Sequence, residues 1–493
     1  MDEKEYILKK FNRNKYSYLL ICFNSGISTL ASLAINYYYK DKLKIQPSFL
    51  SQILAYMKLP YMIKPLYGLL TDIFPIFGYR RKLYIIFSSI TCFLSWFLLS
   101  FFKLGVFESA FCLFVANVNL AFSSVLSQAI FVELGKLTYN GEKVGNTKDL
   151  VSVYFIVKNL GFVLAATLKG VLIELFSVET VFFINSLNQT MMFIAGFILI
   201  EERITDNNEE KKKLISNETK SGDTKDEKET KSGDTKDEKE TKNGDTKEEK
   251  DENKQKAGTV SDLIKYIFQK KVLVPYIYVL IFLSTPAYLE TMFYYCSNVL
   301  KLTANKFGII QTYQMGLNLG IVFLYKNYLS KKLSFKQTLT LSKTILFITL
   351  IPNYFLVKGL TKNYINDFYI VLITTSSNFM VTTLSCLPIF DLAAKLSPKN
   401  LEGTVYALFT SGISFGEFNS TLFGSWLTKF YNISSTNFDN LINLIVTINM
   451  IILLPLPILY AIPNYFFEPE TKKDKKEETT KSDEKDDKKV KSE

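Results

Sequence analysis

The sequence predicts an all-α membrane protein with about twelve transmembrane helices arranged in two six-helix bundles. Three observations predict this fold: long apolar runs, basic segments between the runs, and one hydrophilic block that divides the runs into two sets of six. A helix of about 20 apolar residues is long enough to cross about 30 Å of hydrocarbon. The chain therefore alternates between segments suited to lipid and segments suited to water.

The apolar runs continue through most of the chain. The first run, 16–38, follows a polar segment and is too long for the core of a signal peptide, so we expect it to remain as the first transmembrane helix. The other runs lie at about 48–71, 83–102, 107–134, 150–174, 180–200, 272–297, 304–329, 338–358, 367–394, 403–430 and 438–466.

The distribution of lysine and arginine predicts the orientation. These residues gather at the N-terminus and in the gaps after the second, fourth and eighth runs, whereas the other gaps are generally poorer. The gap Lys40–Lys44 is an exception. Cytoplasmic loops carry the excess of positive charge. We therefore expect a multi-pass protein with both termini and the central block in the cytoplasm, in the plasma membrane or, alternatively, in an organelle membrane.

The hydrophilic block contains a tandem repeat of eleven residues. Glu218–Lys228 reads ETKSGDTKDEK, Glu229–Lys239 repeats it, and Glu240–Lys250 reads ETKNGDTKEEK. The repeat has no apolar seam, so we expect a disordered spacer rather than a coiled coil. The expected organisation is a cytoplasmic N-terminus at 1–15, a six-helix bundle at 16–200, a disordered linker at 201–260, a second bundle at 261–466 and a disordered cytoplasmic tail at 467–493.

The composition argues against several other functions. Histidine is absent, and the five cysteines are scattered through the apolar runs without a CxxC pair, so they are expected to be packing residues. The sequence contains no nucleotide-binding loop, zinc signature or G-x-S-x-G motif. The net charge of +11 comes from the gaps rather than from a soluble basic face. We therefore expect no enzyme activity, no cofactor or metal, and no nucleic-acid partner.

The second apolar run contains two prolines and a lysine. Pro60 and Pro65 interrupt the helix, which membrane proteins tolerate where a neighbour or a water-filled cavity satisfies the freed carbonyls. Lys64 lies between them, about eight residues or roughly 12 Å from the basic end of the run. A lysine at that depth usually faces a cavity or an acidic partner, and the alternative is snorkelling to the interface. We favour the cavity.

The same segment ends in a G-x-x-x-D…G-x-R-R pattern formed by Gly68, Asp72, Gly78, Arg80 and Arg81. The pattern resembles the signature of the loop between the second and third helices in the major facilitator superfamily. That resemblance implies a substrate site between two six-helix halves near the membrane midplane. It also implies a cytoplasmic gate, in which the aspartate accepts hydrogen bonds from an arginine and from a facing helix N-terminus.

The full sequence of this segment, IKPLYGLLTDIFPIFGYRRK, resembles the signature of the folate–biopterin transporter family. Thr285–Tyr295 is similar to the family's seventh helix, and Leu387–Gly416 is similar to its tenth and eleventh, with matching residues at Pro398, Glu402, Thr404 and Ala407. The resemblance covers both halves apart from the linker and tails. It implies a secondary active transporter that moves folate, pterin or a related organic anion across the bilayer by alternating access.

The chain departs from the family pattern at several acidic positions. Ser124 and Gln128 stand where we expect aspartates in the fourth helix, which leaves Glu133 as its acid. Leu289 stands where an acid is expected in the seventh helix, with Glu290 beside it. Fewer acids within the membrane count against proton coupling and against the family's usual pterin specificity.

The candidate substrate contacts are cations and aromatic side chains. Lys64 and Lys158 would form a cationic floor for the carboxylates of folate, although Lys158 is equally suited to an ion pair with Glu417 or Glu133. Aromatic rings would stack on a flat pterin, although most aromatics in membrane proteins face lipid or form interface belts. The aromatic candidates are Tyr61, Tyr67, Phe293 and Tyr294.

The candidate gate and coupling residues are charged. Asp72 with Arg80 and Arg81 would form a latch at the cytoplasmic gate. Glu133 and Asp391 occupy equivalent runs of the two halves and would serve as gate residues or as proton carriers, since a carboxyl withdrawn from water can bind a proton near neutral pH. Glu402 and Glu417 complete the set.

Two alternatives remain open from the sequence. The first is the same fold with a divergent substrate, such as an amino acid, another organic anion or a drug-like molecule. The second is a sensor or scaffold that does not transport and acts through the charged linker and tail.

Overall fold

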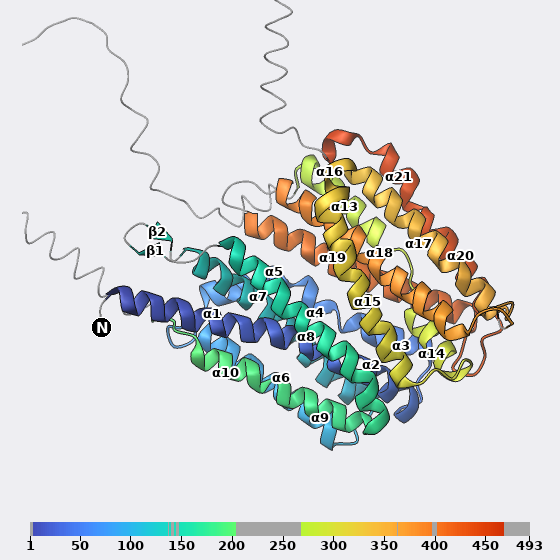
Figure 1. Ribbon diagram of the computed structural model, residues 1–493, viewed down its shortest axis with the longest axis horizontal. Helices are drawn as coiled ribbons and strands as arrows, with labels where there is room; N and C mark the ends of the chain where they lie inside the picture. Colours follow the sequence, from blue (N-terminus) through green and yellow to red (C-terminus); the bar gives the residue numbers. More distant parts are fainter. Residues whose placement is uncertain are drawn as a thin grey trace, which may run out of the picture.

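The computed structural model of the chain is predominantly helical, and Figure 1 shows its helices running side by side. It describes residues 3–136, 138–139, 142–143, 147–203, 268–361, 363–396 and 402–467. The eleven-residue repeats and the predicted tail lie outside the described residues. We call residues 3–203 the N-terminal half and residues 268–467 the C-terminal half.

The N-terminal half begins with one long helical stretch that changes from α to 3-10, back to α, and then to π geometry. It also contains a short antiparallel hairpin, β1 (Thr138–Tyr139) and β2 (Glu142–Lys143). The helical elements are α1 (Glu3–Ile27), η1 (Ser28–Ala31), α2 (Ser32–Tyr37), η2 (Tyr38–Lys42), α3 (Pro47–Tyr56), α4 (Leu59–Met62), α5 (Lys64–Ile73), α6 (Lys82–Phe101), α7 (Val106–Lys136), α8 (Thr147–Leu175), α9 (Val178–Asn188) and α10 (Thr190–Ile198).

The C-terminal half repeats this pattern of long helices with short connections. Its elements are α13 (Lys270–Leu283), α14 (Leu289–Asn298), α15 (Ala304–Leu324), η3 (Tyr325–Leu329), α16 (Ser330–Lys332), α17 (Phe335–Val357), α18 (Asp367–Leu396), α19 (Glu402–Phe430), α20 (Leu441–Leu453), α21 (Pro455–Ala461) and η4 (Asn464–Phe466). We call the end of the molecule that holds Arg203 and Phe268 the linker end, and the opposite end, which holds the connections 43–46 and 299–303, the distal end.

Nine helical stretches in the described part of the chain are long and apolar enough to cross a membrane. Three predicted runs, 48–71, 272–297 and 403–430, are not among them. The first is divided into α3, α4 and α5, with Pro60 and Pro65 near the start of the second and third of these helices. The second is broken over residues 284–288, around Pro286. The third forms the continuous α19, whose charged, hydroxyl and glycine residues lower its hydropathy.

Helices within each half pack closely on one another. In the N-terminal half α1 packs on α7, α8 and α10, and α6 packs on α7, α9 and α10. In the C-terminal half α17 packs on α18 and α20, α13 on α19, and α15 on α18. The main contacts between the halves join α8 to α15, α3 to α14 and α19, and α4 to α19. The run 48–71 therefore meets the runs 272–297 and 403–430 across this interface, and these three are the predicted runs that look least like membrane spans.

The apolar core is shared by the two halves only towards the distal end. There, Tyr39, Trp96 and Phe182 belong to the same buried cluster as Tyr294 and Ile445. Towards the linker end each half has a core of its own. The cluster in the N-terminal half includes Tyr18, Ile85, Leu126 and Met192, and the cluster in the C-terminal half includes Val272, Phe282, Ile389 and Phe409. The halves are thus joined at the distal end and packed separately at the linker end.

The break at 284–288 is held against α19 by a close contact between main chains. The Ala287 N–H donates to the Ser420 carbonyl at 3.2 Å. A Cβ atom built on Gly424 would lie 1.6 Å from the Ala287 carbonyl oxygen. Only a residue without a side chain allows the two segments to approach this closely.

We expect Gly424→Ala to lower the melting temperature of the purified protein by several degrees. The added methyl group has to displace a main-chain carbonyl, and overpacking of this kind costs about 1–3 kcal/mol. Gly316→Ala in α15 is the matched control, because a Cβ there meets no atom within 4 Å. A Gly424→Ala protein as stable as the control would contradict the close approach.

Candidate functional site

The halves are held together at the distal end by hydrogen bonds that centre on α3. Ser51 donates to Glu290 Oε2 at 3.3 Å, Gln52 donates to Ser425 Oγ at 3.2 Å, and Ser425 Oγ donates to the Ser48 carbonyl at 2.7 Å. Three further bonds join Tyr294 Oη to the Ile45 carbonyl at 2.7 Å, the Ser435 N–H to Gln46 Oε1 at 2.8 Å and the Asn305 N–H to Glu174 Oε1 at 2.9 Å.

One ion pair between the halves lies deeper than these bonds. Lys58 Nζ is 3.5 Å from Glu417 Oε2. Lys58 occupies the break between α3 and α4, and Glu417 belongs to α19. The ring of Tyr56 meets that of Phe418 beside this pair, with the centroids 5.9 Å apart. The break after α3 thus contributes the positive charge of this contact, and the polar helix α19 contributes the negative charge.

Two glycines allow α8 and α15 to cross closely near the distal end. A Cβ built on Gly170 would lie 2.7 Å from the Ala304 carbonyl oxygen, and one built on Gly308 would lie 3.0 Å from the Gly170 Cα. Small residues at helix crossings are the usual way for membrane helices to bring their main chains together. This crossing closes a second side of the distal interface.

A cavity of about 500 Å³ adjoins the distal contacts and lies mainly within the C-terminal half. Its size falls in the range of sites for small organic ligands. Leu33, Asn36 and Lys58 line it from the N-terminal half. The rest of its wall comes from the break at 284–288 and from α13, α14, α15, α17, α18, α19 and α20.

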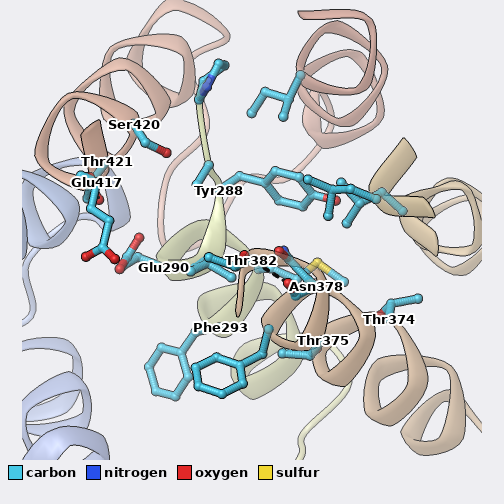
Figure 2. Close-up of a pocket in the computed structure, with 18 of the residues that line it drawn as sticks. Tyr288, Glu290, Phe293, Thr374, Thr375, Asn378, Thr382, Glu417, Ser420 and Thr421 are labelled. Carbon is cyan, nitrogen blue, oxygen red and sulfur yellow. Dashed lines mark hydrogen bonds between the residues drawn. The ribbon is translucent and has the colours of Figure 1, made fainter. Parts of the chain in front are cut away.

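The lining of the cavity combines charges with neutral polar groups. Figure 2 shows the carboxylates of Glu290 and Glu417 extending toward the same region from α14 and α19, while Asn378 and Thr382 project from α18. Asn353, which is buried, donates to Tyr288 Oη at 3.1 Å. The cavity therefore offers carboxylates, amides and hydroxyls to a ligand within a mainly apolar wall.

A buried lysine that the sequence analysis missed also lines the cavity. Lys343 on α17 is 4% exposed, donates to Thr285 Oγ1 at 2.7 Å, and lies 4.4 Å from the centroid of the Phe282 ring. The available signal was a lysine inside the apolar run 338–358, the same signal that selected Lys64 and Lys158. A second missed lysine, Lys169, is equally buried but donates to Ser32 Oγ at 3.2 Å and does not line the cavity.

The predicted cations Lys64 and Lys158 lie in the N-terminal half and outside the cavity lining. Lys64 begins α5, and its ammonium lies 5.1 Å from the centroid of the Tyr61 ring. Lys158 on α8 lies 5.6 Å from the centroid of the Phe162 ring. Lys64 is within electrostatic range of Lys158 and also of the carboxylate of Glu417.

The four predicted aromatic contacts separate into different roles. Phe293 lines the cavity, and Tyr61 lies beside Lys64. Tyr67 packs edge-on against Phe122 with the centroids 5.4 Å apart. Tyr294 is fully buried and joins the halves through its hydrogen bond to the Ile45 carbonyl. Of the four, the structure therefore places only Phe293 in the cavity wall.

The loop between α5 and α6 makes a tight reversal at the linker end. The N–H and carbonyl groups of Ile76 and Tyr79 bond to one another at 3.0 and 2.9 Å. The two residues between them, Phe77 and Gly78, have φ angles of 49° and 84°. Glycine adopts the left-handed region without steric cost, which gives a physical reason for the glycine of the G-x-R-R pattern.

A glutamate from outside the pattern holds this loop in place. The carboxylate of Glu201 accepts hydrogen bonds from the main-chain N–H groups of Arg80, Arg81 and Lys82 at 2.9–3.1 Å. A carboxylate at a helix N-terminus satisfies unpaired N–H groups and complements the helix dipole. The sequence analysis assigned Glu201 to the linker, because nothing in its local pattern marks it as a cap for a helix more than a hundred residues earlier.

The two arginines of the predicted latch lie in different surroundings. The Arg81 side chain is buried and forms an ion pair with Glu133 on α7, whereas Arg80 is exposed. Among the described residues, Glu133 thus pairs with Arg81 and Glu417 with Lys58. The side chains of Asp72 and Glu402 lie outside what the structure describes.

Further contacts hold the linker end of each half. Arg203 Nε donates to Tyr79 Oη at 3.1 Å, and Lys10 forms an ion pair with Glu202. In the C-terminal half Asp391 accepts a hydrogen bond from Tyr325 Oη at 2.6 Å. The acids of the fourth and tenth predicted runs, Glu133 and Asp391, are therefore both engaged within their own half.

Solved structures share this fold with the chain. A D-xylose–proton symporter matches with a TM-score of 0.55 and 11% identity over 92% of this chain and 97% of its own. A nucleoside transporter matches at 0.59, with 11% identity over 94% and 100%. A peptide transporter crystallised with sulfate matches at 0.60, with 13% identity over 95% and 99%. The chain thus has the fold of these membrane transporters.

The chain belongs to the BT1 family, whose model matches residues 25–484. It is 28% identical to folate transporter 1 of Plasmodium falciparum (isolate 3D7) over 460 residues, which cover 92% of this chain and 80% of that protein. It is 25% identical to the folate–biopterin transporter of Synechocystis sp. (strain ATCC 27184 / PCC 6803 / Kazusa) over 446 residues, which cover 90% and 81%. The family resemblance found in the sequence is confirmed.

Proposed function

We propose that the protein is a secondary active transporter that carries folate, pterin or a related organic anion across a membrane by alternating access. The observation that carries this proposal is the family match over residues 25–484, with relatives named as folate and folate–biopterin transporters. The polar cavity beside the contacts between the halves gives such a substrate a place to bind.

The proposed architecture has twelve membrane crossings in two bundles of six. The nine long apolar stretches supply nine crossings, and the broken segments α3–α5 and α13–α14 together with the polar α19 supply the other three. Broken and polar helices are tolerated where they face a cavity instead of lipid. The cavity lining by the break at 284–288 and by Glu417 supports this assignment.

We place the linker end in the cytoplasm, because Arg80, Arg81, Lys331 and Lys332 gather there. Both termini, the predicted linker 201–260 and the tail then lie on the cytoplasmic side. The contacts between α3, α14 and α19 accordingly close the outer side of the pathway, and the separate cores at the linker end support an inward-open state. In this state a substrate would enter or leave from the cytoplasm.

The charged residues take three proposed roles. Lys64 and Lys158 give the N-terminal half an electropositive surface for an anion. Arg81 with Glu133, and Asp391 with Tyr325, support structural roles at the gate in preference to proton transport. Glu290 and Glu417, which line the cavity, are the acids best placed for any coupling to protons.

Uptake into liposomes tests the function. Purified protein should accumulate labelled folate or biopterin, and the effect of an imposed pH gradient decides whether protons are coupled. Empty liposomes are the control. Transport of an amino acid or a drug-like molecule, with no uptake of folate or pterin, would favour a divergent substrate within the same fold.

A linker deletion separates transport from a scaffold function. Replacing residues 204–260 with a neutral spacer should leave uptake unchanged, because Glu201, Glu202 and Arg203 keep their contacts with the N-terminal half. Replacing residues 201–260 should lower uptake, since it removes the cap on α6. Equal uptake by both deletion proteins would contradict the role of Glu201, and a loss with the shorter deletion would point to a function of the linker itself.

A further inference from the structure

The cavity of the C-terminal half contains a cation without an acidic partner. Lys343 is 4% exposed and lines the cavity, yet among the described residues it forms no ion pair. Its partners are the Thr285 hydroxyl at 2.7 Å and the face of the Phe282 ring at 4.4 Å. A charged group withdrawn from water is costly unless an opposite charge or a full set of hydrogen bonds compensates it.

The ammonium group of Lys343 retains bonding capacity. A lysine ammonium has three N–H donors, and within the described part of the chain only Thr285 accepts one of them. The Phe282 ring stabilises the positive charge but accepts no strong hydrogen bond. Two donors therefore remain for a group that enters the cavity.

Lys169, a buried lysine of the N-terminal half, can be compared with Lys343. Lys169 is also 4% exposed and also donates to one hydroxyl, that of Ser32 at 3.2 Å. It lies in α8 and does not line the cavity. Burial and bonding are thus matched between the two lysines, and only Lys343 can meet a ligand in the cavity.

The acidic groups of the cavity lie on another side. Glu290 and Glu417 contact the N-terminal half through Ser51 and Lys58, whereas Lys343 contacts Thr285 in the break at 284–288 and Phe282 on α13. An anionic group would be repelled by the two carboxylates and attracted by the ammonium. The cavity therefore has a positive side at Lys343 and a negative side at Glu290 and Glu417. A ligand that is charged at one end would bind in one preferred orientation.

We propose that Lys343 forms a carboxylate-binding subsite of the transport cavity. The ligand is an organic anion whose carboxylate bonds to the ammonium and whose N–H-bearing ring faces the side of Glu290 and Glu417. This inference rests on the proposed function, and it names the residue that distinguishes carboxylated from neutral substrates of the same transporter.

Equilibrium binding to the purified full-length protein tests the subsite with three ligands. Folate has both a pterin ring and carboxylates, 4-aminobenzoylglutamate has carboxylates without the pterin, and biopterin has the ring without a carboxylate. Lys343→Met should weaken binding of folate and 4-aminobenzoylglutamate at least about tenfold and change biopterin binding less than about twofold. Lys343→Arg should keep most of the affinity for the carboxylated ligands.

Lys169→Met is the matched control and should not change the preference among the three ligands. Lys343→Met should melt no lower than the wild type, because it removes a buried charge and keeps the length of the side chain. Equal losses for all three ligands, or none, would overturn the proposal. If the wild type binds 4-aminobenzoylglutamate but neither folate nor biopterin, the folate and pterin assignment fails and a related organic anion is left as the substrate, while the Lys343 subsite is still decided by the same variants. If the wild type binds none of the three, both proposals are overturned.

Discussion

Replacing Lys58 with glutamate is expected to lower the initial rate of substrate uptake at least about tenfold, which corresponds to about 1.4 kcal/mol. The change removes the ion pair with Glu417 and brings a third carboxylate to the side of the cavity that already holds Glu290 and Glu417. Like charges placed together at an interface repel by several kcal/mol. The distal contacts should therefore open, and the protein should spend less time in the state that closes this end.

The double variant Lys58→Glu with Glu417→Lys restores opposite charges and should recover most of the uptake. A cysteine at Ser425, which is 1% exposed, reports the opening directly, because it should react with a maleimide reagent faster in the Lys58→Glu protein. Lys42→Glu is the control, since Lys42 pairs with Glu179 within one half and neither residue lines the cavity. Failure of the double variant to recover uptake would indicate that Glu417 acts on the substrate and not through Lys58.

Replacing Arg81 with alanine is expected to have the second large effect, a loss of uptake of about five- to thirtyfold for a cost of one or two kcal/mol. The guanidinium is buried against Glu133, so its removal leaves a carboxylate without its partner and frees the loop that carries Gly78 from α7. This cost lies between the costs of breaking an exposed and a buried ion pair, because the Arg81 side chain is buried and the Glu133 side chain is 52% exposed.

Arg80→Ala is the matched control for this variant. Arg80 is the adjacent arginine of the same pattern, but its side chain is exposed and its described bond to Glu201 uses the main-chain N–H, which alanine keeps. Uptake should fall less than about twofold, as for most surface substitutions. Equal losses in the two variants would show that positive charge alone, and not the Arg81–Glu133 contact, supports transport.

Nine of the predicted spans could be found from the sequence because hydropathy depends on composition over about 20 residues, which a single sequence displays directly. The same rule explains where the prediction and the structure differ. The runs 48–71, 272–297 and 403–430 contain proline breaks or polar residues, and the structure assigns these segments to the cavity and the inter-half contacts. The low hydropathy or the proline breaks of these runs thus coincide with a place in the cavity wall or in the contacts between the halves.

The candidate site was predicted less well. The sequence selected Lys64 and Lys158 as lysines inside apolar runs, and Lys343 and Lys169 have the same signature. Only the fold separates these four, since it places Lys343 alone among them in the cavity wall. The partners of the charged residues could not be predicted from the sequence either. Glu201 caps α6 across more than a hundred residues, and Lys58 pairs with Glu417 across the two halves.

The sequence by itself determined the many membrane crossings, the basic linker end and the family, because each depends on local composition or on a short motif. The tertiary structure decided which charges meet, which helices of the two halves pack together and which lysine faces the cavity. These depend on contacts between α3, α14, α17 and α19, which are far apart in the chain. Their distances in space follow from helix packing and are not encoded in any one segment.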